Sequence, residues 1–241
     1  MILRRITEHV KAQNWFAVWI DFLIVVVGVF IGLQVANWND VRQARSEEQG
    51  YLERLRDDFS ASISANENMI GFMSAQISNN NFAMEALKAC ELAPENRDRF
   101  AGALISIGKI IPTQLFDATI KELNATGKFQ YIRSDQVRNA ISRHLDAIEV
   151  EESIMRAIEQ RAIPHTVYVE SQIEYKVSEI GDLDGRPAWS RIGIDFDKLC
   201  QDHRFRRAIS VNSLYLADVA NRVQSNVDAQ KEILALLEED S

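Results

Sequence analysis

The chain has 241 residues, of which 46% are hydrophobic and 26% charged, so it can bury a sizeable core. It contains only 10 glycines and 4 prolines, too few turn residues for a fold of many short strands. Its formal net charge of −8 repels nucleic-acid phosphates. These observations favour an all-α fold and exclude a typical nucleic-acid-binding protein.

The first predicted element is a membrane-spanning helix over residues 15–38. As a helix, its 24 residues extend about 36 Å, which is enough to cross a bilayer, and Asp21 is its only charged residue. Trp15, Trp19 and Trp38 lie near its two ends, where indole side chains prefer the headgroup layer. A cleaved signal peptide is the alternative, but such peptides have a shorter apolar core followed by a small-residue cleavage site.

The predicted span divides the chain into a tail at 1–14, the span at 15–38 and an extramembrane domain at 39–241. Basic residues flank the span on both sides, three against four, so their count does not fix the orientation. A short basic tail before the first span usually stays in the cytoplasm, and long domains cross regardless of charge. We therefore predict a single-pass protein with a cytoplasmic tail and an external helical domain.

One face of the predicted span carries small residues at four-residue steps, namely Gly28, Gly32 and Ala36. Such a stripe lets a second helix approach closely, although glycine is also tolerated in membrane helices without a partner. Asp21 lies two turns before Gly28 and therefore on nearly the same face. Its carboxyl group lies either at the water interface or, if buried, acts as a proton-responsive acid.

The rest of the chain also predicts helices. Apolar residues at three- and four-residue steps extend the membrane helix to about Ile77. Three consecutive asparagines then predict a kink at 79–81. Further helices are predicted at 82–90, 97–107, 113–123, 135–163 and 165–178. Pro164 is predicted to end or kink the longest of them. The alternating valines of the last segment would also suit a strand.

The last predicted helix carries a seam with a seven-residue spacing. Its members are Ile209, Asn212, Leu216, Val219, Val223, Asn226, Gln230, Ile233 and Leu237. The polar members weaken a free-standing zipper, so the seam favours packing within a bundle. The predicted fold is all-α, with one N-terminal transmembrane helix that continues into a long helix packed in an extramembrane helical bundle.

The only cysteines are Cys90 and Cys200. Two lone cysteines, each beside polar sequence, suit one disulfide in an oxidising compartment, and two unrelated buried thiols are the alternative.

No recognised catalytic pattern occurs in the chain. The four histidines, His9, His144, His165 and His203, form no HxxxH or HExxH pair, which leaves a zinc hydrolase without visible ligands. Phosphate-binding glycine loops, a GxSxG elbow and CxxC motifs are also missing from the sequence. We therefore predict a protein that is not an enzyme and has no cofactor or metal site.

Two segments resemble one family of proteins. Residues 20–40, IDFLIVVVGVFIGLQVANWND, resemble the N-terminal signature of an uncharacterised family of bacterial single-span proteins, DUF6090. Residues 113–148 are similar to a second stretch of that family, and together the two segments cover 57 of the 241 residues. The resemblance implies a bacterial single-pass envelope protein, and it implies no activity. With the predicted orientation, we expect the span in the inner membrane and the helical domain in the periplasm.

The sequence therefore predicts a membrane-anchored, non-catalytic helical protein that is an accessory or structural subunit. Its predicted partners are the lipid bilayer and other transmembrane helices, from further copies of the chain or from a larger membrane complex. The alternative function is a proton-responsive, single-span component resembling energy transducers, in which Asp21 is the responsive acid.

Overall fold

The computed structural model describes residues 15–109, 111–176 and 187–239, apart from the side chains of residues 15–18 and 21. The tail predicted at 1–14 lies outside the described residues. The chain forms two compact units, Met1–Tyr51 and Leu52–Ser241. The helix α2 (Trp15–Ala89) contributes residues to both.

In the first unit, α2 contains the apolar segment. Among the described residues, this is the one helix that is long and apolar enough to cross a membrane, and none of the residues in its apolar window is buried. The prediction of a helix with the length and composition of a membrane span is therefore confirmed.

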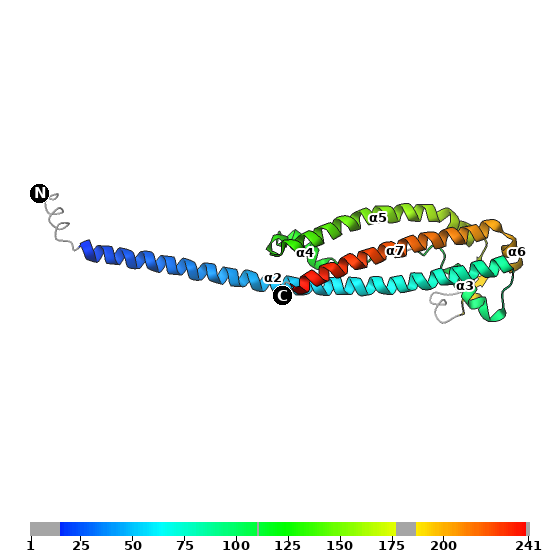
Figure 1. Cartoon of the computed structure of the whole chain (residues 1–241), viewed down its shortest axis with the longest axis horizontal. Coiled ribbons are helices and arrows are strands. Elements are labelled where there is room, and N and C mark those ends of the chain that lie inside the picture. The colour runs from blue at the N-terminus through cyan, green and yellow to red at the C-terminus, as the bar shows by residue number, and fades with distance from the viewer. Residues whose placement is uncertain (1–14, 110, 177–186, 240–241) are drawn as a thin grey trace. The chain divides into compact units, whose positions relative to one another are not determined.

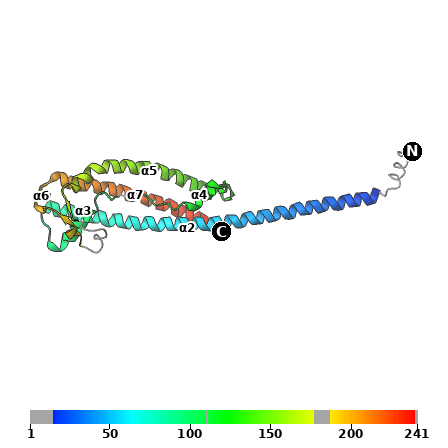
Figure 2. The same cartoon turned by 180° about the vertical axis from the view of Figure 1, so that it is seen from behind.

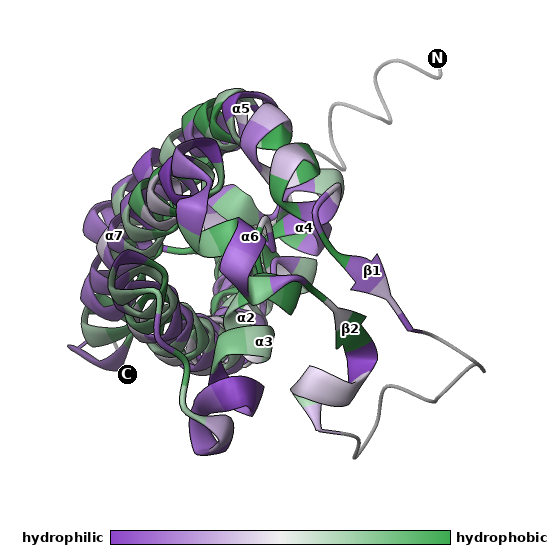
Figure 3. Cartoon of the chain, turned by 90° about the vertical axis from the view of Figure 1, so that its right-hand side faces the viewer, coloured by the Kyte–Doolittle hydropathy of each residue, from purple (hydrophilic) through white to green (hydrophobic). Residues whose placement is uncertain are grey.

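In the second unit, the rest of α2 packs with α5 (Asp135–Glu170) and α7 (His203–Glu239), and the three helices run side by side in both views (Figures 1 and 2). Seen along their length, they surround a common interior (Figure 3). The structure is 84% helical, which confirms the all-α prediction.

Shorter elements connect the three long helices. They are η1 (Pro94–Asn96), α3 (Arg97–Ile105), α4 (Ala118–Ala125), η2 (Phe129–Tyr131), β1 (Glu174–Tyr175), η3 (Ala188–Arg191), β2 (Ile192–Gly193) and α6 (Phe196–Gln201). The two strands pair antiparallel, with Glu174 opposite Gly193.

The predicted seam of α7 is confirmed, because all nine of its residues are buried. In the middle of the bundle, Leu216, Val219 and Val223 join a core cluster with Met73 of α2 and Ile158 of α5. A second cluster at the end near the disulfide joins the last turns of α2 to α3, α6 and the start of α7. The seven-residue spacing predicted this face correctly because it keeps one stripe of the helix directed at its neighbours.

Two predicted helix ends are wrong: the separate helix predicted at 82–90 is part of α2, and α5 does not end at Pro164. The kinks predicted at 79–81 and at Pro164 stay predictions. The α2 helix continues through Asn79–Asn81 to Ala89, with Asn80 only 1% exposed and Leu87 fully buried on the same helix. The α5 helix contains Pro164 but continues to Glu170, and Val169 beyond the proline is fully buried. Proline removes one backbone hydrogen bond, and the core packing beyond it keeps the chain helical.

Two predicted boundaries were also wrong. The helix predicted at 165–178 reaches only Glu170, as the end of α5, and the strand alternative for this segment holds at β1. Residues 177 and 178 lie outside the described residues. The helix predicted at 113–123 begins only at Ala118, because the residues before it are held in an irregular segment by side chains of α2.

Candidate functional site

The small-residue stripe of the span is open along its glycines. A Cβ atom built on Gly28 or Gly32 would meet no described atom within 4 Å. Ala36 is also exposed. The apolar side chains around the helix are uncovered as well, since Phe30 is 61% and Leu33 64% exposed. An exposed apolar surface of this extent is typical of a segment that lipid or another protein covers.

The predicted interface anchors are described in part. Trp19 and Trp38 are 63% and 64% exposed. The guanidinium carbon of Arg42 lies 5.9 Å from the centre of the Trp38 ring, one helical turn further along, which is within the range of a cation–π contact. The side chains of Trp15 and Asp21 lie outside the described residues, so the predicted role of the Asp21 carboxyl stays a prediction.

In the second unit, α2 carries a polar stripe, which we define as Arg54, Asp58, Ser62 and Asn66. These residues are spaced four apart and therefore lie on one face of the helix. All four contact the segment 113–122, which follows α3 and includes the start of α4.

The deepest contact of the polar stripe is made by Asn66, which is fully buried. Its Nδ2 donates to the Gln114 carbonyl at 2.9 Å, and the Gln114 N–H donates to its Oδ1 at 2.8 Å. The same Nδ2 lies 3.2 Å from Oε1 of Gln230, which is a buried residue of the α7 seam. One amide side chain therefore joins α2, the connecting segment and α7.

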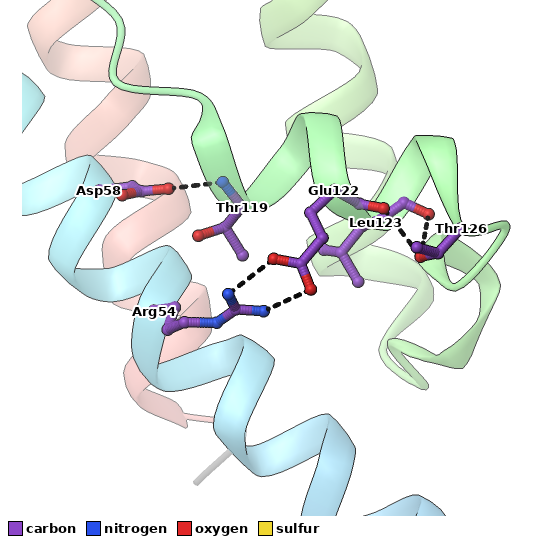
Figure 4. Close-up of polar contacts among 6 residues, drawn as sticks. All are labelled: Arg54, Asp58, Thr119, Glu122, Leu123 and Thr126. Carbon is purple, nitrogen blue, oxygen red and sulfur yellow. Dashed lines mark hydrogen bonds and ion pairs between the residues drawn. The ribbon is translucent and has the colours of Figure 1, made fainter.

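Ser62 and Asp58 continue these contacts toward α4. The Phe116 N–H donates to Ser62 Oγ at 2.9 Å, and this hydroxyl donates in turn to the Asp58 carbonyl at 2.8 Å. The Thr119 N–H, in the first turn of α4, donates to Oδ2 of Asp58 at 3.0 Å (Figure 4). The local N-cap residue Asp117 makes no side-chain cap, so Asp58 caps α4 from another helix.

The spacing of the polar stripe matches the connecting segment. Four residues of α-helix advance about 6.0 Å, and two residues of extended chain advance about 6.6 Å. Successive stripe residues, Asn66 and Ser62, therefore reach alternate residues, Gln114 and Phe116. The backbone polar groups of Gln114 and Phe116 thus find hydrogen-bond partners without forming a helix. For this reason α4 begins five residues later than the sequence predicted.

Arg54 closes the stripe with a forked contact. Its two terminal nitrogens lie 2.7 and 3.2 Å from the two carboxylate oxygens of Glu122 (Figure 4). Both side chains are more than two-fifths exposed, so this ion pair contributes little to stability and mainly orients α4.

The two cysteines meet at the end of α2. Cys90, the residue after α2, is joined to Cys200 of α6 by a disulfide, with the Cα atoms 5.2 Å apart. Cys90 has a φ of 54°, in the left-handed region that ends many helices. The bond closes a loop with a sequence separation of 110 residues and fixes the C-terminal end of α2 to the start of the α6–α7 segment.

The structure brings together no group of metal ligands among the residues that it describes. No three histidine, cysteine, aspartate or glutamate side chains there lie close enough to bind an ion. His144 is buried, whereas His203 is exposed, and no catalytic arrangement joins them. The predicted lack of enzymatic activity remains a prediction.

Sequence analysis did not identify the polar stripe as a site. The signal was present as four polar residues at four-residue steps in an otherwise amphipathic helix. Its partners lie about 50 to 70 residues away in the sequence and follow no recognisable motif.

The fold and these surfaces define a helical-bundle protein that carries one helix of membrane-spanning length. Comparison with models of protein families, with curated proteins and with solved structures gave no match. Membership of DUF6090 therefore stays a prediction from the resemblance of residues 20–40 and 113–148.

Proposed function

We propose that this protein is a single-span membrane protein whose helical domain has no catalytic role and serves as a subunit of an assembly. The partners are further copies of the chain or the subunits of a larger membrane complex, joined to it through the span. On the family resemblance together with the predicted orientation, the membrane is the inner membrane of a bacterium and the helical domain is periplasmic.

One observation carries the proposal. The apolar window of α2 has no buried residue, and small side chains follow one face of it as the open stripe of Gly28, Gly32 and Ala36. In a bilayer, bulky apolar side chains pack about as well against lipid as against another helix, so they contribute little to association. A small-residue stripe lets the backbones of two helices pack closely, which favours association. The stripe is therefore the face that another transmembrane helix would occupy.

The test is association of the full-length chain in mild detergent or in lipid nanodiscs. We expect the variant Gly28→Leu/Gly32→Leu to associate roughly tenfold more weakly than the natural chain, because leucines on the stripe would hold the two helix backbones apart. A tenfold change corresponds to a loss of about 1.4 kcal/mol in the free energy of association. Chemical crosslinking in membranes, followed by mass spectrometry of all crosslinked chains, measures both self-association and binding of other subunits.

A matched control is Val26→Leu, which adds bulk two residues before Gly28 and thus about 200° around the helix. It should leave the crosslinked products unchanged. Equal products from the natural chain and the glycine variant would contradict assembly through the stripe. Recovery of the full-length chain in the aqueous fraction without detergent would contradict the anchor itself.

A further inference from the structure

His144 of α5 is an unusual residue of the bundle interior. Its side chain is 4% exposed, and neither ring nitrogen has a hydrogen-bond partner among the described residues. Nearly all buried polar groups in folded proteins have such partners, and an orphaned group costs free energy. A leucine or phenylalanine would fill the position without that cost.

The ring lies between α2 and a cavity. On one side it contacts Phe59 of α2, with ring centres 6.2 Å apart and planes inclined by 55°. On the other it belongs to the wall of a cavity of about 530 Å³ between α5 and α7, which is open to solvent and is also lined by the exposed Arg143, Ser225 and Glu232. Since both nitrogens are covered, a molecule in this cavity would not reach them while the helices stay in place.

Four charged residues line the same cavity, but none is bonded to the imidazole. They are Arg143 and Glu151 of α5, and Arg222 and Glu232 of α7. Arg222 lies 3.2 Å from an oxygen of Asp218 and 3.5 Å from Oε2 of Glu151, so Arg222 and Glu151 are paired with each other.

Three charged residues directly precede Phe59 on α2: Asp57 is exposed, and the other two are bonded elsewhere. Arg56 donates to the Leu237 carbonyl, with its Nε at 3.0 Å, and Asp58 accepts from the Thr119 N–H. Neither is bonded to the histidine. An imidazolium at this position would therefore lack a counter-charge bonded to it in the closed bundle.

Burial lowers the pKa of the His144 imidazole, because the surroundings disfavour its charged form. The closed bundle consequently holds the neutral ring. If α5 moves away from α7, water reaches the ring, and its pKa returns toward the ordinary histidine value of about 6.5.

We propose that His144 is a proton-sensitive latch between α5 and α7: the neutral ring keeps the pair closed, and its protonation separates the two helices so that water reaches the ring. The proposal uses only the second unit and does not depend on the function proposed for the span.

Proton linkage determines the direction and the size of the pH effect on the closed state. The open state binds the additional proton, so the closed state keeps its full stability above about pH 6.5 and loses it as the pH falls below that value. Between pH 7.5 and pH 5.0, the ratio of open to closed molecules should rise by up to about thirtyfold.

The experiment is hydrogen–deuterium exchange of the full-length protein in detergent at pH 7.5 and pH 5.0, corrected for the pH dependence of the chemical exchange rate. In the natural chain, protection of amides in α5 and α7 around the cavity should fall by up to about thirtyfold at pH 5.0. In His144→Phe that fall should disappear. His203→Gln, at an exposed histidine, should behave as the natural chain does.

A second measurement covers the case in which the phenylalanine variant does not fold. In the natural chain, NMR titration of the histidine ring protons should place the pKa of His144 below the ordinary histidine value of about 6.5, and the amides around the cavity should open as this ring titrates. Equal acid-induced opening in the natural chain and in folded His144→Phe would overturn the latch. A His144 ring that titrates at the ordinary histidine value without any loss of amide protection would also overturn it.

Discussion

Reduction of the Cys90–Cys200 disulfide should lower the free energy of unfolding of the helical domain by about 4 to 5 kcal/mol. The bond closes a loop with a sequence separation of 110 residues, and opening it restores the conformational freedom of that loop in the unfolded chain. Urea unfolding followed by circular dichroism, with and without reductant, measures the difference.

The controls for this prediction use the cysteine positions themselves. Reductant should have no effect on Cys90→Ala/Cys200→Ala. Because Cys90 has a left-handed backbone, Cys90→Gly/Cys200→Ala should exceed the double-alanine variant in stability by about 1 kcal/mol. A natural chain that unfolds at the same urea concentration with and without reductant would show that the bond does not constrain the fold.

Asn66→Ala should lower the free energy of unfolding by about 2 to 3 kcal/mol. The change removes both hydrogen bonds to the Gln114 backbone and leaves Gln230, which is fully buried, without its partner. The same urea titration measures the loss, and exchange of the amides at 114 and 116 should accelerate more than exchange in the middle of α7.

The matched control is Asn68→Ala, which makes the same chemical change two residues further along α2 at an exposed position. It should alter the stability by less than about 0.5 kcal/mol. Equal stability of the two variants would mean that the polar stripe does not hold the connecting segment.

The features that sequence analysis predicted correctly are those with a local repeat. The apolar run of α2 and the seven-residue seam of α7 each depend on residues within one helix, so their pattern is complete in the sequence. The seam even included its polar members correctly, since Asn226 and Gln230 are buried beside the apolar ones.

The features that it missed depend on distant partners. Residues 113–117 directly precede a helix in the sequence and were predicted to belong to it. Their backbone instead bonds to the side chains of Ser62 and Asn66, and these hydrogen bonds would be lost if the segment were helical. The continuation of α5 past Pro164 likewise depends on core contacts beyond the proline. Single-sequence patterns contain neither kind of information, because they do not record which segments become neighbours.

The disulfide also determines what proteolysis would do to this chain. Cys90 precedes and Cys200 follows the whole stretch that contains α3, α4 and α5. A single backbone cut within that stretch would leave two polypeptides that are still covalently linked. The fragment carrying the apolar helix would thus retain α7 after nicking, and only a reducing environment would release it.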